Sequence, residues 1–264
     1  MKNMPAGQYI PGTSIIHRLD ARMKIISLIF LLVAIISTST IFGYVFVLAV
    51  IVAVIKLSRL PILTVLSPIR KLWMFFIVIF IMNALFYSVQ QPVLSWWIIS
   101  LSEEGVRQGA RVVLNVCFIM ILGNILTSST APIDMTNALS NLLKPLKLLR
   151  VPVDDVAMII NVAIQFIPTL IGEADIIRKA QTARGARFES RKLHEKALSF
   201  LPLLIPIFIS AFRRVDELSI AMEARGYRNA NNRTKKISQP FRISDFTAVA
   251  LSTIFCLAQI YLIG

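Results

Sequence analysis

The chain has 264 residues, of which 56% are hydrophobic and only 16% are charged, and its mean hydropathy is +0.72. A soluble domain usually carries about a quarter charged residues, so this composition argues against a cytosolic enzyme, a disordered segment and a disulfide-stapled secreted domain. The formal charge is +14, from 28 Lys and Arg against 14 Asp and Glu. Because the apolar residues come in long runs, the positive charge indicates a membrane protein with a basic cytoplasmic face.

Five apolar runs are candidates for membrane-spanning helices. They are residues 25–37, 41–57, 72–89, 112–127 and 246–263. The first is short for a bilayer that needs about 20 helical residues. Two further runs, residues 156–171 and 197–212, are interrupted by proline and can either cross the membrane or lie in its interface.

The basic residues favour five spans over seven. With five spans and a cytoplasmic N-terminus, Arg107 and Arg111 are the only Lys or Arg residues placed toward the outer side. With seven spans, the basic stretch from Arg178 to Lys196 would lie outside, against the positive-inside rule. We therefore predict membrane helices 1–4 in residues 1–128, a cytoplasmic helical domain in residues 129–243 and the last membrane helix in residues 244–264, with seven spans as the alternative.

The apolar runs are poor in the ionisable side chains that ion-coupled transport needs within the membrane. Apart from Lys56, next to the last residue of the second run, none of the five contains Asp, Glu, Lys or Arg, which ion-coupled transporters need within the membrane. Asn83, Asn115 and Asn124 are interpreted as hydrogen-bonding groups between helices. A stand-alone permease or channel with a basic cytoplasmic domain stays open as an alternative, although the missing charges argue against it.

Neither the cysteines nor the histidines form a pattern typical of a disulfide or a metal site. The chain also lacks an HExxH motif and the phosphate-binding loop G-x-x-x-x-G-K-[ST]. We therefore expect no catalytic residues, no metal and no cofactor, and ATP would have to be hydrolysed by another chain. The basic residues 228–242 are better explained by anionic lipid than by nucleic acid.

The predicted cytoplasmic domain contains three helical segments. Residues 133–149 carry apolar side chains at helical spacing, and Pro145 should bend this amphipathic helix. The second helix should begin at Asp154 or Asp155 and end at Gly185. The third should run from near residue 197 to 226. The second and third helices each have an apolar first half and a charged second half.

The ends of these two helices look like copies of each other, 41 residues apart (183 to 224). Ala183-Arg184-Gly185 recurs as Ala224-Arg225-Gly226, and Asp175 recurs as Asp216. Gly is favoured just past a helix end because it adopts the left-handed conformation without strain, and Arg offers five donors in one plane. One copy would be an ordinary helix cap, but two matched copies predict a pair of docking tips for carboxylates or backbone carbonyls.

These motifs resemble those of the transmembrane T-component of energy-coupling factor (ECF) vitamin transporters, the EcfT/CbiQ family. His17-Arg18-Leu19-Asp20 with Lys24 resembles the N-terminal signature of the family, and Pro145-Leu146-Lys147 resembles its middle region. The strongest match is Ala221-Met222-Glu223-Ala224-Arg225-Gly226-Tyr227. The resemblance runs almost from end to end of the chain.

The resemblance implies an all-α membrane protein with about five transmembrane helices and three long amphipathic coupling helices at the cytoplasmic side. Such a chain is a non-catalytic scaffold in a prokaryotic plasma membrane, with a cytoplasmic N-terminus. Its partners would be two ABC-type ATPases, a membrane-embedded substrate-binding S-component and lipid, for the uptake of a vitamin or a transition metal.

The family also implies which residues meet these partners. The expected ATPase-docking residues are Ala183, Arg184, Gly185, Ala224, Arg225 and Gly226, supported by Asp175, Arg187, Asp216, Glu223 and Arg228. The apolar surface expected to hold the S-component comprises Met135, Leu139, Leu142, Leu146, Ile160, Ile164, Ile167, Leu204 and Phe208.

Overall fold

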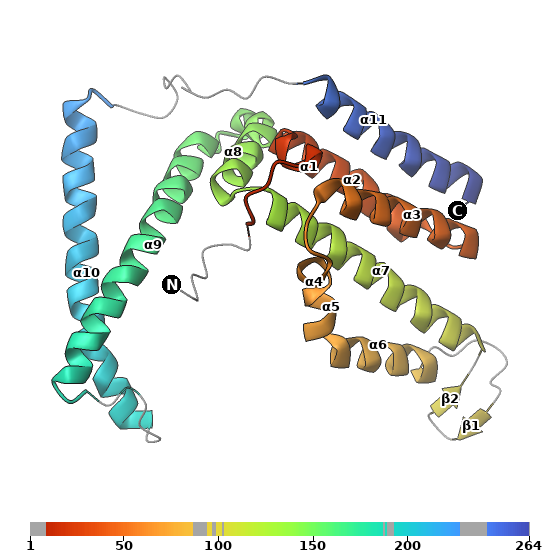
Figure 1. Ribbon diagram of the computed structural model, residues 1–264, viewed down its shortest axis with the longest axis horizontal. Coiled ribbons are helices and arrows are strands. Elements are labelled where there is room, and N and C mark those ends of the chain that lie inside the picture. Colours follow the sequence, from red (N-terminus) through yellow and green to blue (C-terminus); the bar gives the residue numbers. More distant parts are fainter. Residues whose placement is uncertain are drawn as a thin grey trace. The chain divides into compact units, whose positions relative to one another are not determined.

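The structure is a computed structural model that describes residues 9–86, 94–96, 99–101, 103–186, 188, 193–227 and 242–263. The described residues are mostly helical, as Figure 1 shows, and the predicted all-α membrane fold is confirmed. They fall into two compact units. One unit contains described residues within Leu139–Ile237, and the other contains those within Gly7–Ala138 and Ser238–Gly264.

The second of these units, which we call the membrane unit, contains all five predicted membrane runs. Its elements in chain order are α1 (Ile15–Arg18), α2 (Ala21–Ser37), α3 (Ile41–Ser58), α4 (Ile62–Val65), α5 (Ser67–Lys71), α6 (Trp73–Phe86), β1 (Leu94–Trp96), β2 (Ile99–Leu101), α7 (Glu103–Ser129), the start of α8 (Pro132–Leu142), and α11 (Ile243–Ala258) with a π-helical turn at Gln259–Ile263. The strands form an antiparallel hairpin in which Ser95 pairs with Ser100. Helix α7 packs against α2, α3 and α6, and α2 packs against α11.

The core of the membrane unit lies where α2, α3 and α7 meet. Ile35, Val47 and Ile51 are almost fully buried there, and Phe118 and Ile121 of α7 complete the contact. Most other apolar side chains of α3 and α6 stay exposed, as expected for helices whose outer faces meet lipid rather than water.

Helix lengths partly match the predicted spans. In the described part of the chain, four helices are long and apolar enough to cross a membrane: α3, α7, α9 (Val153–Ala183) and residues Ile243–Tyr261. Helix α6 is apolar but shorter. Helix α7 begins at Glu103, before the apolar run that starts at residue 112. It packs closely on α6 at Gly109, where a Cβ would lie 3.1 Å from the Phe80 carbonyl oxygen.

Two of the three predicted asparagine contacts join helices. The Asn124 side-chain amide donates to the carbonyl oxygens of Thr64 (2.7 Å) and Val65 (3.1 Å), so α7 holds the short helix α4. The Tyr44 hydroxyl of α3 donates to the side-chain oxygen of Asn115 (3.1 Å). For Asn83 the prediction is wrong: its amide donates to the Ile79 carbonyl oxygen one turn earlier in α6 (2.9 Å).

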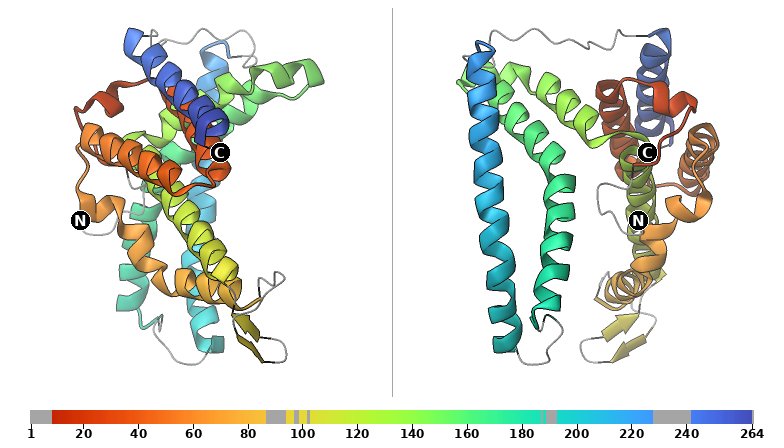
Figure 2. Two further views of the ribbon diagram at one scale, coloured as in Figure 1. Left: turned by 90° about the vertical axis from the view of Figure 1, so that its right-hand side faces the viewer. Right: turned by 60° about the vertical axis from the view of Figure 1, so that its left-hand side comes forward.

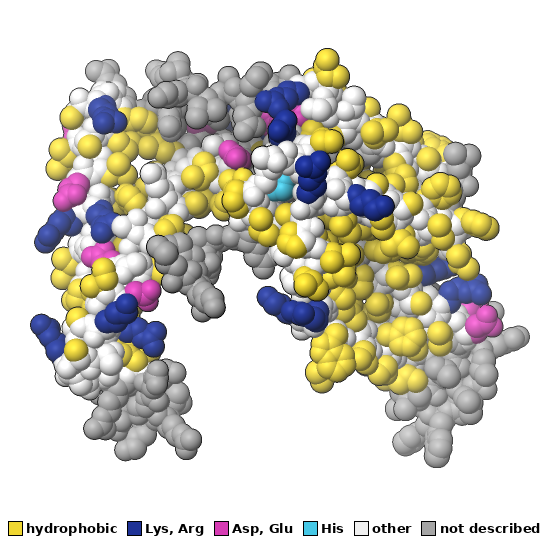
Figure 3. Space-filling model, viewed as in Figure 1, with side chains coloured by type: hydrophobic (Ala, Val, Ile, Leu, Met, Phe, Trp, Pro, Cys, Tyr) yellow, Lys and Arg dark blue, Asp and Glu magenta, His cyan; other side chains and the backbone are white. Residues whose placement is uncertain are grey.

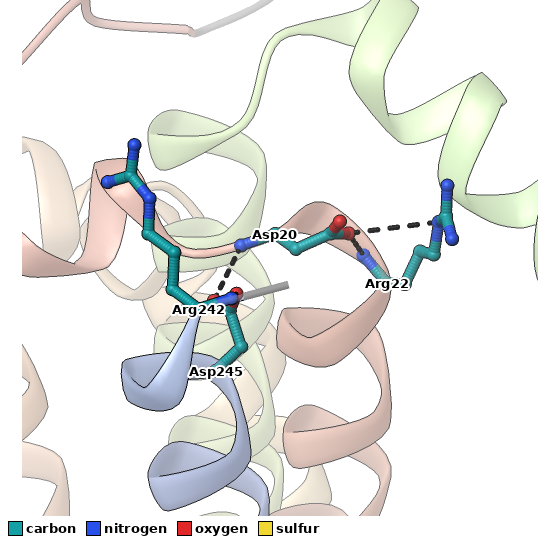
Figure 4. Close-up of polar contacts among 4 residues, drawn as sticks. All are labelled: Asp20, Arg22, Arg242 and Asp245. Carbon is teal, nitrogen blue, oxygen red and sulfur yellow. Dashed lines mark hydrogen bonds and ion pairs between the residues drawn. The ribbon is translucent and has the colours of Figure 1, made fainter. Parts of the chain in front are cut away.

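A buried polar cluster fastens the start of α2 to the start of α11, as Figure 4 shows. The Asp20 carboxylate caps α2 by accepting from Arg22 N (2.8 Å). The Asp245 carboxylate accepts from Asp20 N (3.0 Å) and from Arg242 N (2.7 Å). Lys24, one turn into α2, donates to the Ser129 carbonyl oxygen (3.0 Å) at the end of α7. The cluster therefore ties together the two ends of the membrane unit that continue into the other unit.

We expect Asp245→Ala to destabilise the membrane unit strongly. Asp245 is 1% exposed, and its loss leaves two backbone N–H groups without their partner at a cost of about 2–4 kcal/mol. The melting temperature in detergent should fall by roughly 5–10 °C. Glu104→Ala, which removes an exposed carboxylate from α7, should change it little; an equal fall in both variants would contradict the role of the cluster.

The other unit, which we call the coupling unit, is built from the end of α8, a 3₁₀ segment at Lys144–Leu149, α9 and α10 (Leu193–Ala224). The segment predicted as one helix bent at Pro145 is α-helical only to Leu142, and a tighter 3₁₀ segment contains the proline. Helix α9 begins one residue before the predicted Asp154, which pairs with Lys147. Helix α10 begins at Leu193 rather than near Ala197.

Candidate docking site

The two predicted docking tips have the same backbone structure. At the end of α9, Ala186 N donates to the Gln181 carbonyl oxygen (3.0 Å) and Gly185 N to that of Thr182 (3.0 Å). At the end of α10, the bonds 41 residues later are the same, from Tyr227 N to Met222 O (3.0 Å) and from Gly226 N to Glu223 O (2.8 Å). Both pairs form the Schellman motif, which uses up carbonyl groups that a helix end would otherwise leave unbonded.

Glycine is needed at position 185 and at position 226 because of the backbone conformation, and not because a side chain would lack space. Gly185 has a φ of +92° and Gly226 a φ of +74°, in the left-handed region that a side chain disfavours. A Cβ at either position would meet nothing within 4 Å. The glycine therefore turns the chain sharply away from the helix axis and leaves the last residue of the helix accessible.

The arginines of both tips are exposed, and so are the neighbouring Ala183 and Ala224. Arg184 and Arg225 form no ion pair with any residue that the structure describes. Each is the first residue beyond the last helical turn. Each tip thus presents an exposed guanidinium group, with no ion pair to a described residue, beside a small exposed alanine side chain.

Three of the predicted supporting residues, Asp175, Asp216 and Glu223, are described, and their positions do not favour an ion pair with the arginine of the same helix. Asp175 and Asp216 are exposed, and each lies about two and a half helical turns before its arginine, too far for an ion pair within one helix. Glu223 is exposed and lies two residues before Arg225, a spacing that points the side chains in different directions. Two further supporting residues, Arg187 and Arg228, lie outside the described residues.

Helices α9 and α10 run side by side in opposite directions, as Figure 2 shows. Contacts between described residues hold them together, two of them through residues just beyond the helices, Phe188 after α9 and Tyr227 after α10. The Tyr227 hydroxyl lies 2.8 Å from Met158 Sδ, Arg214 Nη2 lies 3.0 Å from Glu173 Oε2, and the rings of Phe188 and Phe200 meet edge to face with centroids 5.8 Å apart. Arg178 also lies over the Phe188 ring, 5.9 Å from its centroid.

This antiparallel pairing places the two docking tips at opposite ends of the pair. Arg184 lies eleven residues beyond Glu173 (173 to 184), and Arg225 lies eleven residues beyond Arg214 (214 to 225), in the opposite direction. At 1.5 Å per helical residue, the two tips are on the order of 30 Å apart. The sequence repeat predicted two tips but not this separation.

The contacts also show that the apolar half of each helix lies beside the charged half of the other. The Met158–Tyr227 and Glu173–Arg214 contacts bracket residues 158–173 of α9 and residues 214–227, the end of α10 and the turn after it. The first stretch is apolar, whereas the second contains Asp216, Glu217 and Glu223. The two apolar runs, 156–171 and 197–212, are therefore not aligned with each other.

The predicted apolar surface of the coupling unit is accessible. Leu139, Ile160, Ile167, Leu204 and Phe208 are exposed by 41–60%. Leu146 is 38% exposed, while Leu142 and Ile164 are partly buried. Figure 3 shows apolar side chains along α9 and α10, at the left, with charged side chains between them. The remaining predicted residue, Met135, lies in the membrane unit and is also partly buried.

Comparison with known proteins decides the family. The sequence matches the family CbiQ, described as cobalt transport protein, over residues 12–237. The chain belongs to the CbiQ family. It is 38% identical over 256 residues to the energy-coupling factor transporter transmembrane protein EcfT of Ruminiclostridium cellulolyticum, covering 97% of this chain and 95% of that protein. The proteins of the same name from Brevibacillus brevis (35% identical over 254 residues, 96% of each chain) and Bacillus subtilis (34% over 235 residues, 89% of each chain) are also similar.

This CbiQ-family chain is therefore a transmembrane T-component of an ECF transporter and a non-catalytic subunit, as predicted. Its helices long and apolar enough to span a membrane agree with this assignment. Within the described ranges, no group of three or more His, Cys, Asp or Glu residues is placed to hold a metal ion. The contacts that hold α9 on α10, above all Glu173–Arg214, were not found by sequence reasoning.

Proposed function

We propose that the chain is the scaffold and energy-coupling subunit of an ECF-type ABC importer for a vitamin or a transition metal. Arg184 and Arg225 would each dock into a groove on one of two ATPase subunits. The observation that carries this proposal is the pair of identically capped, exposed arginine tips at opposite ends of one helix pair. Tips on the order of 30 Å apart are suited to two separate partners rather than to one shared pocket.

The antiparallel register supports an interfacial position for α9 and α10. By length and composition alone, α9 is able to cross a bilayer. If it crossed, the charged half of α10 that lies beside its apolar half would enter the hydrocarbon as well, and each charged residue at the bilayer centre costs about 2.5–3.5 kcal/mol or more. Helices that lie along the membrane surface avoid this cost, and the arrangement agrees with a cytoplasmic N-terminus and five spans.

The apolar surface of the coupling unit would hold the S-component. Exposed Leu and Phe side chains at helical spacing, such as Leu204 and Phe208, form a stripe suited to an apolar partner helix. ATP-driven closure of the two ATPases would move the tips relative to each other, and the stiff helices would carry this motion to the surface that holds the S-component.

Purification from the native membrane tests the proposed function directly. The tagged chain should retain two ABC-type ATPases and a small apolar protein, each identified by mass spectrometry. The competing class, a stand-alone permease or channel, predicts that the purified chain alone transports a solute into liposomes. Uptake by the lone chain, or purification without any ATPase, would contradict the proposal.

The glycines of the tips give a sharper test of the docking geometry. Valine at position 185 or 226 is forced into a left-handed backbone conformation at a cost of about 1–2 kcal/mol, so Gly185→Val and Gly226→Val should distort the Schellman turn. We expect retention of the ATPases to fall about tenfold or more in the double variant. Asparagine tolerates this conformation, so Gly185→Asn with Gly226→Asn is the matched control and should keep most of the bound ATPase.

A further inference from the structure

We propose that the ion pair between Glu173 and Arg214 is the positioning element that sets the register of α9 against α10 and links the movements of the two tips. The inference rests on the proposed function, because it assigns the tips to two ATPases. Glu173 and Arg214 themselves touch no docking partner in this proposal. They act through the helices that carry Arg184 and Arg225.

The first support is the position of the pair in the repeat. Glu173 and Arg214 are 41 residues apart, the same spacing that relates the two docking motifs. When two helices related by a sequence repeat run antiparallel, residues at equivalent positions of the repeat lie opposite each other only where a local twofold axis crosses the pair. The ion pair therefore marks the centre of the helix pair, and each arginine tip lies at the same distance from it along its own helix.

Opposite charges at equivalent positions are the second support. Around the tips, the repeat keeps identical residues, as with Asp175 and Asp216. At the centre it places Glu in one copy and Arg in the other. Two identical charges there would repel each other across the axis, whereas Glu and Arg attract.

The third support is that the contacts described between α9 and α10 include few others that fix the register. Among the described residues of α9 and α10, the buried apolar side chains are Val153, Ala157 and Leu203. The contacts toward the two ends are a hydroxyl–sulfur hydrogen bond and an aromatic edge contact. By contrast, Glu173 Oε2 and Arg214 Nη2 lie 3.0 Å apart with side chains only 26% and 34% exposed, and such a charge-assisted bond is directional and partly protected from water.

The mechanical consequence follows from the length of a helical turn. If α9 slid along α10 by one turn, about 5.4 Å, the two charged groups would separate. With the pair intact, a push on one tip is passed to the other helix at the centre. Without it, each helix can follow its own ATPase, and binding to the ATPases would continue while the coupling between the tips is lost.

The test measures the distance between the tips in the full chain reconstituted in nanodiscs. Spin labels are attached at the equivalent exposed positions through Ala180→Cys and Ala221→Cys, in a background with Cys117→Ala and Cys256→Ala. We expect one narrow distance distribution for the otherwise unchanged chain. Glu173→Arg and Arg214→Glu alone should each broaden it or shift it by about one helical turn, and Glu173→Gln should broaden it less. The double exchange Glu173→Arg with Arg214→Glu should restore it.

A second measurement separates positioning from folding. In the complete transporter, the single variants should keep both ATPases bound but transport at least fivefold less solute per ATP hydrolysed, and the double exchange should recover coupling. Arg213→Glu, an exposed charge reversal next to the pair, is the control and should change neither measurement.

Unchanged distances in the single variants, or no recovery in the double exchange, would overturn the inference. The proposed function would be contradicted by a different result, namely that the unaltered chain binds no ATPase. In that case the distances between the spin labels still decide whether the ion pair sets the register.

Discussion

Reversing both tip charges, in Arg184→Glu with Arg225→Glu, should abolish co-purification of the ATPases and solute uptake. An interface arginine that anchors a partner contributes about 2 kcal/mol or more, and a reversed charge replaces attraction by repulsion. Because each tip docks a different ATPase, the affinity for each ATPase should fall by about thirtyfold or more. Each single variant should lose one ATPase contact and retain the other, because the tips lie at opposite ends of the helix pair.

Membrane insertion and folding should survive these reversals, since both arginines are exposed and pair with no described residue. Lys179→Glu with Arg213→Glu is the matched control, because it reverses one exposed charge on each of the same two helices. It should retain both ATPases. Retention of the ATPases by the tip variant would remove the basis of the docking assignment.

Placing charges on the apolar surface of the coupling unit is expected to release the S-component while leaving the ATPases bound. Leu204 and Phe208 are one helical turn apart and are 44% and 60% exposed. Leu204→Asp with Phe208→Asp removes apolar contact area worth about 2 kcal/mol per side chain and places two charges against an apolar partner. The S-component should therefore bind more than a hundredfold more weakly, measured as its yield relative to the ATPases after purification.

Leu204→Met with Phe208→Leu keeps the surface apolar and controls for changes of shape. This control should retain most of the S-component. If the aspartate variant loses the ATPases and keeps the S-component, the assignments of the two surfaces are reversed. If it retains both partners at the original ratio, the S-component binds elsewhere.

Several features follow from local sequence alone because their causes are local. The apolar runs predict the helices of the membrane unit, and Pro145 predicts the break after α8. The two Ala-Arg-Gly motifs predict capped helix ends, since a Schellman turn depends on a few consecutive residues and on a glycine free to adopt positive φ. By contrast, the polar first turns of α7 pack on α6 at Gly109, a contact between distant residues that no local pattern contains.

The amino-acid sequence by itself determined that the chain is a helical membrane protein with two matched arginine tips, because hydropathy, helix periodicity and capping act over a few turns. Only the tertiary structure decided that the tips lie at opposite ends of an antiparallel pair, that Glu173 meets Arg214 at its centre, and that Asp20 and Asp245 join helices 225 residues apart. These contacts depend on which helices pack together and in which direction. That choice is the sum of many weak contacts between distant residues, and no short stretch of sequence contains it.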